Sequence, residues 1–378
     1  MPWKANTPMT EREAFIETAQ REGANISALC RSFGISRKTG YKWLGRYRRA
    51  GAGGLVEQSR RPQASPRQSD PALEAQIIAA RQQHPAWGAR KLKRWLENQG
   101  LRLPAVSTVH TILQRHGLIH PAVAAQHRPY QRFEMSQPNA LWQMDFKGDF
   151  ALKGGGRCYP LTVLDDHSRF LLGLVACADQ RTDTVQAALT RLFQTYGLPE
   201  RMLMDNGAPW GDSGDNPWTV FTAWLLRLGI RVSHGRPRHP QTQGKDERLH
   251  RTLQAELLSR FSADQLADYQ PVFDDWRAVY NQQRPHQALD LAVPASRYVP
   301  SPRPFPLGLP PLVYPPPLIV RQVDSAGKIS FRNRVLRPGR AFAGQPVGVL
   351  PLADPPGRVA LFFAHTRIRT FDLAPDRL

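Results

Sequence analysis

The chain has 378 residues, 41% of them hydrophobic, and its 51 Lys and Arg against 31 Asp and Glu give a formal net charge of +20 at pH 7. That length suits two to four domains, and the basic excess predicts a polyanionic partner, because neutralising phosphates releases counterions. No apolar run is long enough for a membrane-spanning helix, the start lacks a secretory signal, and three dispersed cysteines argue against disulfides or a cysteine zinc site, so we expect a cytoplasmic protein.

The first 50 residues have the pattern of a helix-turn-helix domain, and residues 1–130 hold 21 Lys and Arg against 8 Asp and Glu. Thr10–Glu13 fits a capping box, and further helices are indicated after Asn25 and after Ser36. A small Cys30 fits where two helices cross, and Gly34 allows the turn between them. The helix after Ser36 is either an ordinary solvated basic helix or, as we favour, a major-groove reader with these DNA-binding residues: Arg37, Lys38, Lys42, Arg46.

Residues 51–69 are rich in Gly, Ser and Pro and predict a linker. A second helical DNA-binding domain is expected over 70–130, beginning with Asp70-Pro71 as N-cap and first helical residue. A helix from about Gly88 and another capped by Ser107 complete three helices. The helix from Gly88 presents outward the basic residues that we expect to contact DNA: Arg90, Lys91, Arg94.

From residue 138 the sequence pattern changes to apolar runs alternating with helical segments, and residues 138–298 predict an α/β domain. Three apolar runs, at 141–146, 159–164 and 170–177, are expected to form an antiparallel meander. A helix over 183–196 and a strand ending at Asp205 follow, and then come helices near 217–228, 244–260 and 264–283.

Beyond this domain, residues 299–317 are proline-dense and predict an extended linker. Residues 318–378 alternate apolar and polar side chains between Gly- and Pro-containing turns, and they hold 10 Lys and Arg against 4 Asp. This tail predicts a small basic β-barrel.

Three carboxylates of the α/β domain are candidates for one catalytic site. Asp145 projects from the first strand, Asp205 ends a strand that we expect beside it, and Glu247 lies on a helix face opposite its apolar stripe. Phosphodiester chemistry commonly recruits divalent metals, which take oxygen ligands. Taken alone, Asp205 is better explained by a turn with Asn206-Gly207, and Glu247 by a solvated ion pair with Arg251.

Several motifs together resemble a known family. Trp142–Asp145, Met204–Gly207 and His239–Arg248 resemble the catalytic core shared by retroviral integrases and bacterial insertion-sequence transposases, the DDE superfamily. Tyr280-Asn281 and Arg284–Leu289 match the usual ending of that core. The resemblance is specific over about 138–298 and looser for the domains on either side.

This resemblance implies an RNase H-like fold in which Asp145, Asp205 and Glu247 bind Mg²⁺ or Mn²⁺ and form the catalytic triad. The last motif lies on a helix with further residues that we expect to contact DNA: Lys245, Arg248, Arg251. The 42 positions from Asp205 to Glu247 exceed the family's usual gap, which we attribute to a polar insertion holding Asp212 and Asp215.

Other acidic and histidine side chains remain as rivals in this region. Asp246 competes with Glu247, although the family pattern puts the acidic ligand just before the Arg. Asp165 and Asp166 form a carboxylate pair between two strands, where turn and cap roles are common. We interpret three histidines as structural or DNA-contacting: His167, His234, His239.

The implied activity is that of a DNA transposase. Residues 1–130 would bind the element's terminal inverted repeats, and the core would cleave the element's ends and join each 3′-OH to target DNA. Two ends must be joined, so we expect a homo-oligomer, at least a dimer, on DNA, and a cytoplasmic, nucleoid-associated protein in a bacterium. The alternatives are a catalytically inactive DNA-binding regulator and a metal-dependent nuclease that cuts without joining.

Overall fold

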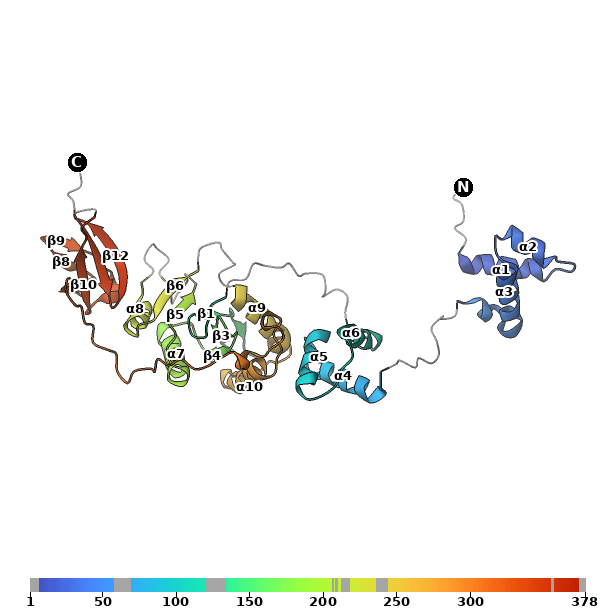
Figure 1. The fold of residues 1–378 in the computed structure, drawn as a ribbon, viewed down its shortest axis with the longest axis horizontal. Helices are drawn as coiled ribbons and strands as arrows, with labels where there is room; N and C mark the ends of the chain where they lie inside the picture. The colour runs from blue at the N-terminus through green and yellow to red at the C-terminus, as the bar shows by residue number, and fades with distance from the viewer. Residues whose placement is uncertain are drawn as a thin grey trace, which may run out of the picture. The chain divides into compact units, whose positions relative to one another are not determined.

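The computed structural model describes residues 7–57, 69–119, 134–205, 207, 210–211, 218–235, 244–354 and 357–373, and the statements below concern these. The chain forms two compact units, Met1–Gln68 and Ser69–Leu378, which are described separately (Figure 1). None of the helices in the described ranges combines the length and apolarity needed to cross a membrane.

The first unit is a bundle of three α-helices, α1 (Pro8–Ala19), α2 (Ile26–Ser32) and α3 (Arg37–Ala50), followed by a 3-10 helix over Gly51–Leu55. The expected N-caps Asn25 and Ser36 are both present. The capping box of α1 pairs Thr7 with Thr10, one turn earlier than expected. Leu55 is buried in the same core as Phe15 and Trp43, so the unit extends past residue 50 into the expected linker.

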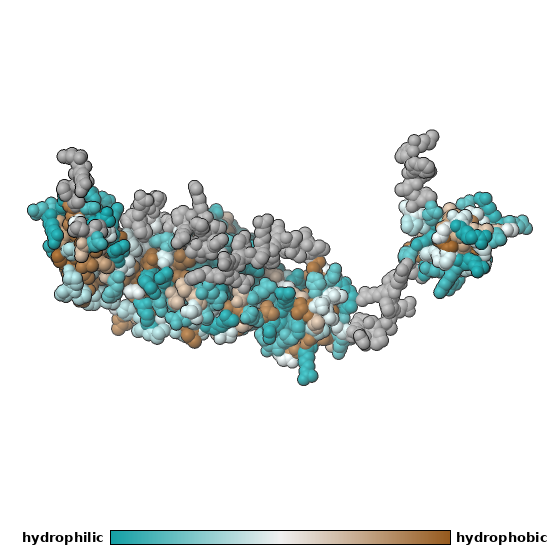
Figure 2. Space-filling view, turned by 45° about the horizontal axis from the view of Figure 1, so that its top comes forward, coloured by the Kyte–Doolittle hydropathy of each residue, from teal (hydrophilic) through white to brown (hydrophobic). Residues whose placement is uncertain are grey.

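The crossing of α2 and α3 depends on two small residues. Cys30 is buried, as predicted, and Gly40 of α3 faces it so closely that an added Cβ would lie 2.4 Å from its sulfur. Gly34 has a φ of +63°, which glycine adopts without strain. Hydrophilic side chains cover most of this unit's visible surface in Figure 2.

The second unit begins with three further helices, α4 (Pro71–Gln83), α5 (Ala89–Asn98) and α6 (Val106–Arg115). Asp70 caps α4 and accepts a hydrogen bond from the Ala72 amide, as the sequence predicted. The third helix follows Ala105, not Ser107, which lies in its first turn. The apolar faces of the three helices enclose one core that contains Ile77, Trp87 and Leu92.

A mixed sheet forms the centre of the second unit. Its strands are β1 (Trp142–Phe146), β2 (Phe150–Ala151), β3 (Arg157–Asp165), β4 (Leu171–Cys177), β5 (Arg201–Met204) and β6 (Arg231–His234). β1, β3 and β4 pair antiparallel, which confirms the predicted meander. β5 pairs parallel with β1 and with β6, a strand that the sequence analysis did not predict.

Helices cover both faces of this sheet. α7 (Thr182–Tyr196) and α8 (Val220–Arg227) pack on the face that carries Leu161 and Val163. α9 (Gly244–Leu253), the π-helix Gln254–Leu258 and α10 (Tyr269–Gln282) pack on the face that carries Leu164 and Leu174. Short 3-10 helices span Leu266–Asp268, Gln287–Leu289 and Pro294–Ser296. A mixed sheet between helices agrees with the expected RNase H-like core.

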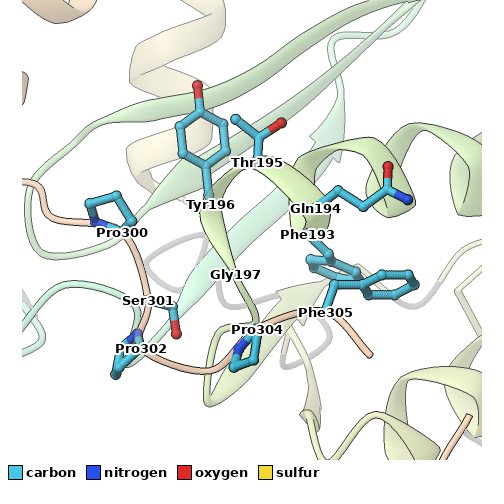
Figure 3. A pocket seen from close by; sticks show the side chains of 10 residues that line it. All are labelled: Phe193, Gln194, Thr195, Tyr196, Gly197, Pro300, Ser301, Pro302, Pro304 and Phe305. Atoms are coloured by element: carbon cyan, nitrogen blue, oxygen red, sulfur yellow. The ribbon is translucent and has the colours of Figure 1, made fainter. Parts of the chain in front are cut away.

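The proline-dense segment runs along the core as an extended strap. Figure 3 shows Pro300–Phe305 beside the end of α7, where Phe305 stacks on Phe193 with ring centroids 6.2 Å apart. Gly197 has a φ of +76°, and an added Cβ would lie 2.7 Å from the Ser301 carbonyl oxygen, so only glycine fits there. The hollow drawn in Figure 3 has no acidic side chain in its lining and is separate from the carboxylates discussed below.

The C-terminal domain consists of open sheets, so the expected barrel is not formed. Four strands, β7 (Ile319–Gln322), β10 (Pro346–Pro351), β11 (Arg358–Phe363) and β12 (Thr366–Asp372), pair in the order β12-β11-β10-β7. β8 (Ile329–Phe331) and β9 (Arg334–Leu336) form a separate hairpin, and a 3-10 helix covers Arg340–Phe342. Ala223 and Leu226 of α8 belong to this domain's apolar core and attach it to the α/β domain.

Candidate active site and nucleic-acid-binding surfaces

Asp145 and Asp205 lie on neighbouring parallel strands. Trp142 pairs with Met202 and Gln143 with Leu203, and continuing this register by two residues puts Asp145 opposite Asp205. The apolar side chains of both strands, including Met144 and Met204, anchor them in the core. The sheet therefore brings together two of the three predicted carboxylates.

Electrostatics connect all three carboxylates. The pKa of Asp145 is raised to about 6, first by burial, then by the negative charge of Asp205, with a smaller contribution from Glu247. The Phe146 amide opposes this rise by donating a hydrogen bond. Repulsion of this kind is relieved when a cation lies between the carboxylates.

Asp205 also forms the turn that its sequence allowed. Its Oδ1 accepts a hydrogen bond of 3.0 Å from the Gly207 amide, and its carbonyl oxygen accepts one of 2.8 Å from Nδ1 of His234. The turn and the candidate site are therefore compatible interpretations of one residue. His234 has a structural role here, as the sequence analysis expected.

Helix α9 presents two adjacent acidic residues to different surroundings. Glu247 is exposed, whereas Asp246 is only 1% exposed. Burial, followed by the charges of Asp145 and Asp166, raises the pKa of Asp246 well above its usual value. Asp246 Oδ1 has no hydrogen-bond partner among the described residues. A buried carboxyl in this setting favours its neutral form, so Glu247 is the stronger candidate for a metal ligand.

The rival pair Asp165 and Asp166 is occupied by structural hydrogen bonds. Asp165 accepts from the amides of Asn139 at 2.7 Å and Ser168 at 2.8 Å. Asp166 accepts from Gln143 Nε2 at 2.6 Å and from the Met135 amide at 2.8 Å, and it pairs with Lys245. Both carboxylates are fully buried, so they fix strands and turns in the core.

A hydrogen-bonded chain that the sequence analysis missed joins α9 to β1. Thr162 Oγ1 donates to the Asp145 carbonyl oxygen at 2.9 Å and lies 2.9 Å from His250 Nε2, which therefore acts as the donor. Burial, with help from Lys147, lowers the pKa of His250 to about 4, so the ring is neutral near pH 7. This chain fixes the helix that carries Glu247 against the strand that carries Asp145.

The three carboxylates are not preassembled into a coordination shell. Within the described ranges, no three His, Cys, Asp or Glu side chains gather closely enough to hold a metal ion. Several predicted residues lie outside those ranges, namely Asn206, Asp212, Asp215 and His239.

The first unit exposes basic side chains at the start of α3. Arg37, Lys38 and Lys42 are exposed there. Arg46 is half-buried, with its guanidinium 5.1 Å from the Trp43 ring. The exposed trio lies on the second helix of the helix-turn-helix, which is the helix that enters the major groove in proteins of this kind.

The second helical domain has two polar surfaces. On α5, Arg90 and Arg94 are exposed, whereas Lys91 is half-buried and its pKa is lowered to about 7, first by burial and then by Arg284. The sequence analysis predicted α6 but assigned no DNA-contacting residues to it, although its position as the third helix of the domain was a signal for such a role. α6 exposes polar side chains between its buried positions: Ser107, His110, Thr111, Gln114.

The basic residues of α9 differ in their exposure. Arg248 and Arg251 are exposed beside Glu247, where DNA could reach them. Lys245 is half-buried and pairs with the buried Asp166, so it is committed to the core.

Family comparisons cover most of the chain. Residues 135–240 and 228–294 match integrase core domains. Residues 11–63 match a helix-turn-helix domain and residues 39–113 a homeodomain-like domain. Residues 319–377 match the C-terminal domain of the IS481 family transposases.

Two of the relatives come from insertion elements. The insertion element IS407 uncharacterized 31.7 kDa protein of Burkholderia multivorans is 30% identical over 42% of this chain, a match that spans about half (54%) of that protein. The insertion element IS476 uncharacterized 39.2 kDa protein of Xanthomonas euvesicatoria is 26% identical over 64% of this chain and 69% of that protein.

A solved simian T-cell lymphotropic virus intasome, in complex with PP2A regulatory subunit B56 gamma, covers 72% of this chain and 93% of its own at 14% identity. Its TM-score of 0.37 is too low to support the assignment. The integrase core, the IS481-type C-terminal domain and the insertion-element relatives together support a bacterial insertion-sequence transposase of the integrase-like superfamily.

Proposed function

We propose that this protein cleaves the ends of its insertion element and joins each 3′-OH to target DNA. The observation that supports this most directly is the convergence of Asp145 from β1, Asp205 from the end of β5 and Glu247 from α9. Three segments far apart in the sequence contribute to one cluster of negative charge. Like charges held close together destabilise a folded domain, so a purely structural role does not explain this cluster.

The donor set fits a hard divalent cation, Mg²⁺ or Mn²⁺, because all three side chains offer carboxylate oxygens. Burial is the main cause of the raised pKa of Asp145, and the negative charges of Asp205 and Glu247 add to it, as expected for carboxylates near one another. When bound, such a metal supplies Lewis-acid activation and neutralises charge at the reacting phosphate. Asp145, Asp205 and Glu247 hold it, while exposed Arg248 and Arg251 bind flanking DNA phosphates.

The helical domains supply recognition of the terminal inverted repeats. Arg37, Lys38 and Lys42 lie on the helix that enters the major groove in the first domain. In the second domain, Arg90 and Arg94 bind backbone phosphates, and the polar face of α6 reads base edges. Because transposition joins two ends, the active form on DNA is a homo-oligomer, at least a dimer.

A strand-transfer assay tests the proposal, with labelled end DNA from the flanks of the gene, magnesium, and the full-length protein. The wild type should cut and join, and Asp205→Asn should do neither while binding end DNA equally well. Asp275→Asn is the matched control, because Asp275 is an exposed carboxylate on α10. A wild type that cuts intact end DNA but does not join even pre-cut ends would be a nuclease. Binding without either reaction, in magnesium or manganese, would indicate a regulator.

A further inference from the structure

The carboxylate of Glu256 bridges the second helical domain and the α/β core, beside an apolar contact from Val279 of α10. Glu256 Oε1 accepts a hydrogen bond of 3.1 Å from Trp87 Nε1 and another of 2.9 Å from Arg284 Nε. The side chains of Glu256 and Arg284 are only 11% and 7% exposed. The three residues come from the turn between α4 and α5, from the π-helix and from the segment after α10.

Both partners of Glu256 are held rigidly. Trp87 is buried in the core of the helical domain and stacks on His84, with ring centroids 3.8 Å apart. The Arg284 guanidinium lies 5.6 Å from the Tyr280 ring and 3.4 Å from His286 Nε2. A carboxylate that bridges fixed donors in two domains transmits a displacement of one domain to the other, because close-packed interiors transmit strain.

The local charges explain why this position is acidic. Burial, Arg284 and Arg248 lower the pKa of Lys91 to about 7, and the negative charge of Glu256 opposes this lowering. His84 and His286 also face the junction, and burial lowers the pKa of each. A neutral side chain at position 256 would leave the buried Arg284 without its counter-ion.

Glu256 lies just after the helix that carries Glu247, so a contact at Glu256 can affect the position of Glu247. The π-helix Gln254–Leu258 continues directly from α9, the helix that carries Glu247. π-helical turns are rare and are often found at functional sites. Nearer the sheet, α9 is held by His250, bonded through Thr162 to the Asp145 strand, and by the Lys245–Asp166 ion pair. The helix of Glu247 is therefore held from the sheet and from the DNA-binding domain.

We infer that Glu256 is a positioning residue that couples the docking of the second DNA-binding domain to the placement of Glu247. End DNA bound by that domain and the acidic residue of α9 then move as one body. The catalytic half of this inference rests on the proposed transposase function, whereas the mechanical half does not. A simpler role, in which the contact only adds stability, makes different predictions.

Distances test the mechanical half. Spin labels on Gln82→Cys in α4 and Asp275→Cys in α10 of the full chain report the distance between the helical domain and the α/β core. Both positions are exposed, and the three native cysteines are buried. The distance distribution should be narrow in the parent and broad in Glu256→Gln and in Trp87→Phe. Glu97→Gln is the matched control, because Glu97 pairs with Lys93 inside α5. An unchanged distribution in Glu256→Gln would overturn the inference.

Single-turnover cleavage tests the catalytic half. At saturating end DNA, Glu256→Gln and Trp87→Phe should slow cleavage about 10- to 100-fold, as small misplacements do, while the Kd for end DNA stays within about twofold, because the groove-facing surfaces are intact. The double variant should be no slower than Glu256→Gln alone. If Glu256→Gln lowered the Tm without changing the cleavage rate, or if the rate losses of the two single variants were additive in the double variant, Glu256 would only be a stabilising contact. A wild type that cannot cut would refute the proposed function and this catalytic half, but not the docking measured by distance.

Discussion

Replacing Asp145 by Asn should stabilise the metal-free protein, although it should abolish catalysis. Asp145 is partly withdrawn from water beside Asp205, with Glu247 adding further negative charge. Asn keeps the shape of the side chain and removes the charge. The gain comes from relief of burial and repulsion, and it exists only while no cation lies between the carboxylates.

The pKa of Asp145, about 6 against an ordinary 3.8, sets the magnitude. The folded state holds the proton more tightly than the unfolded state, so wild-type stability falls as pH rises from about 4 to about 6. A difference of two pKa units corresponds to about 3 kcal/mol, which solvent screening at a half-buried site reduces to about 1 to 3 kcal/mol. The advantage of Asp145→Asn is full above pH 6 and falls to about a third at pH 4.5.

Calorimetric unfolding in the presence of a chelator measures this difference. At pH 8 the core transition of Asp145→Asn should lie above that of the wild type, and at pH 4.5 this difference should shrink to about a third. Magnesium should then raise the wild-type transition and leave the variant nearly unchanged, because binding stabilises only a folded state that has the site. A variant less stable than the wild type at pH 8 would refute the electrostatic reasoning.

Three further predictions concern other parts of the chain. Gly40→Ala should destabilise the first unit by about 1 to 3 kcal/mol, because the new methyl would lie 2.4 Å from the Cys30 sulfur; Gly45→Ala, with open space around it, should be neutral or stabilising in the same thermal melt. Glu247→Gln should reduce strand transfer more than about 100-fold, whereas Asp246→Asn should cost less than about tenfold because burial already favours its neutral form; the reverse order would make Asp246 the ligand. Lys38→Ala should weaken end binding and lower the slope of log K against log salt by about one; a salt-insensitive loss would argue against a phosphate contact.

The parts of this fold that local patterns determine could be predicted from the sequence. The alternation in 141–146 and the apolar strand before Asp205 were sufficient to expect two neighbouring strands with carboxylates at one edge, and the register of β1 and β5 agrees. Cys30 and Gly34 likewise indicated the helix crossing and turn of the first unit. Such features depend on residues close in sequence, where periodicity and turn chemistry are informative.

The features that were missed depend on contacts between distant residues. Alternation in 318–378 predicted strands, but whether strands close into a barrel depends on pairing between the first and last of them, and here β7 and β12 form the two edges of a four-stranded sheet. The burial of Asp246 beside exposed Glu247 depends on how α9 packs on the sheet. The contact from Trp87 to Glu256 spans 169 positions and leaves no local signal.

The most direct test of the central claim is anomalous diffraction from crystals of the protein soaked in manganese. We expect a Mn²⁺ peak at a coordination distance of about 2.0 to 2.3 Å from carboxylate oxygens of Asp145 and Asp205, with Glu247 turned toward it, and no peak in Asp205→Asn crystals. A peak on Asp165 and Asp166, with Asp145 and Asp205 empty, would contradict the claim.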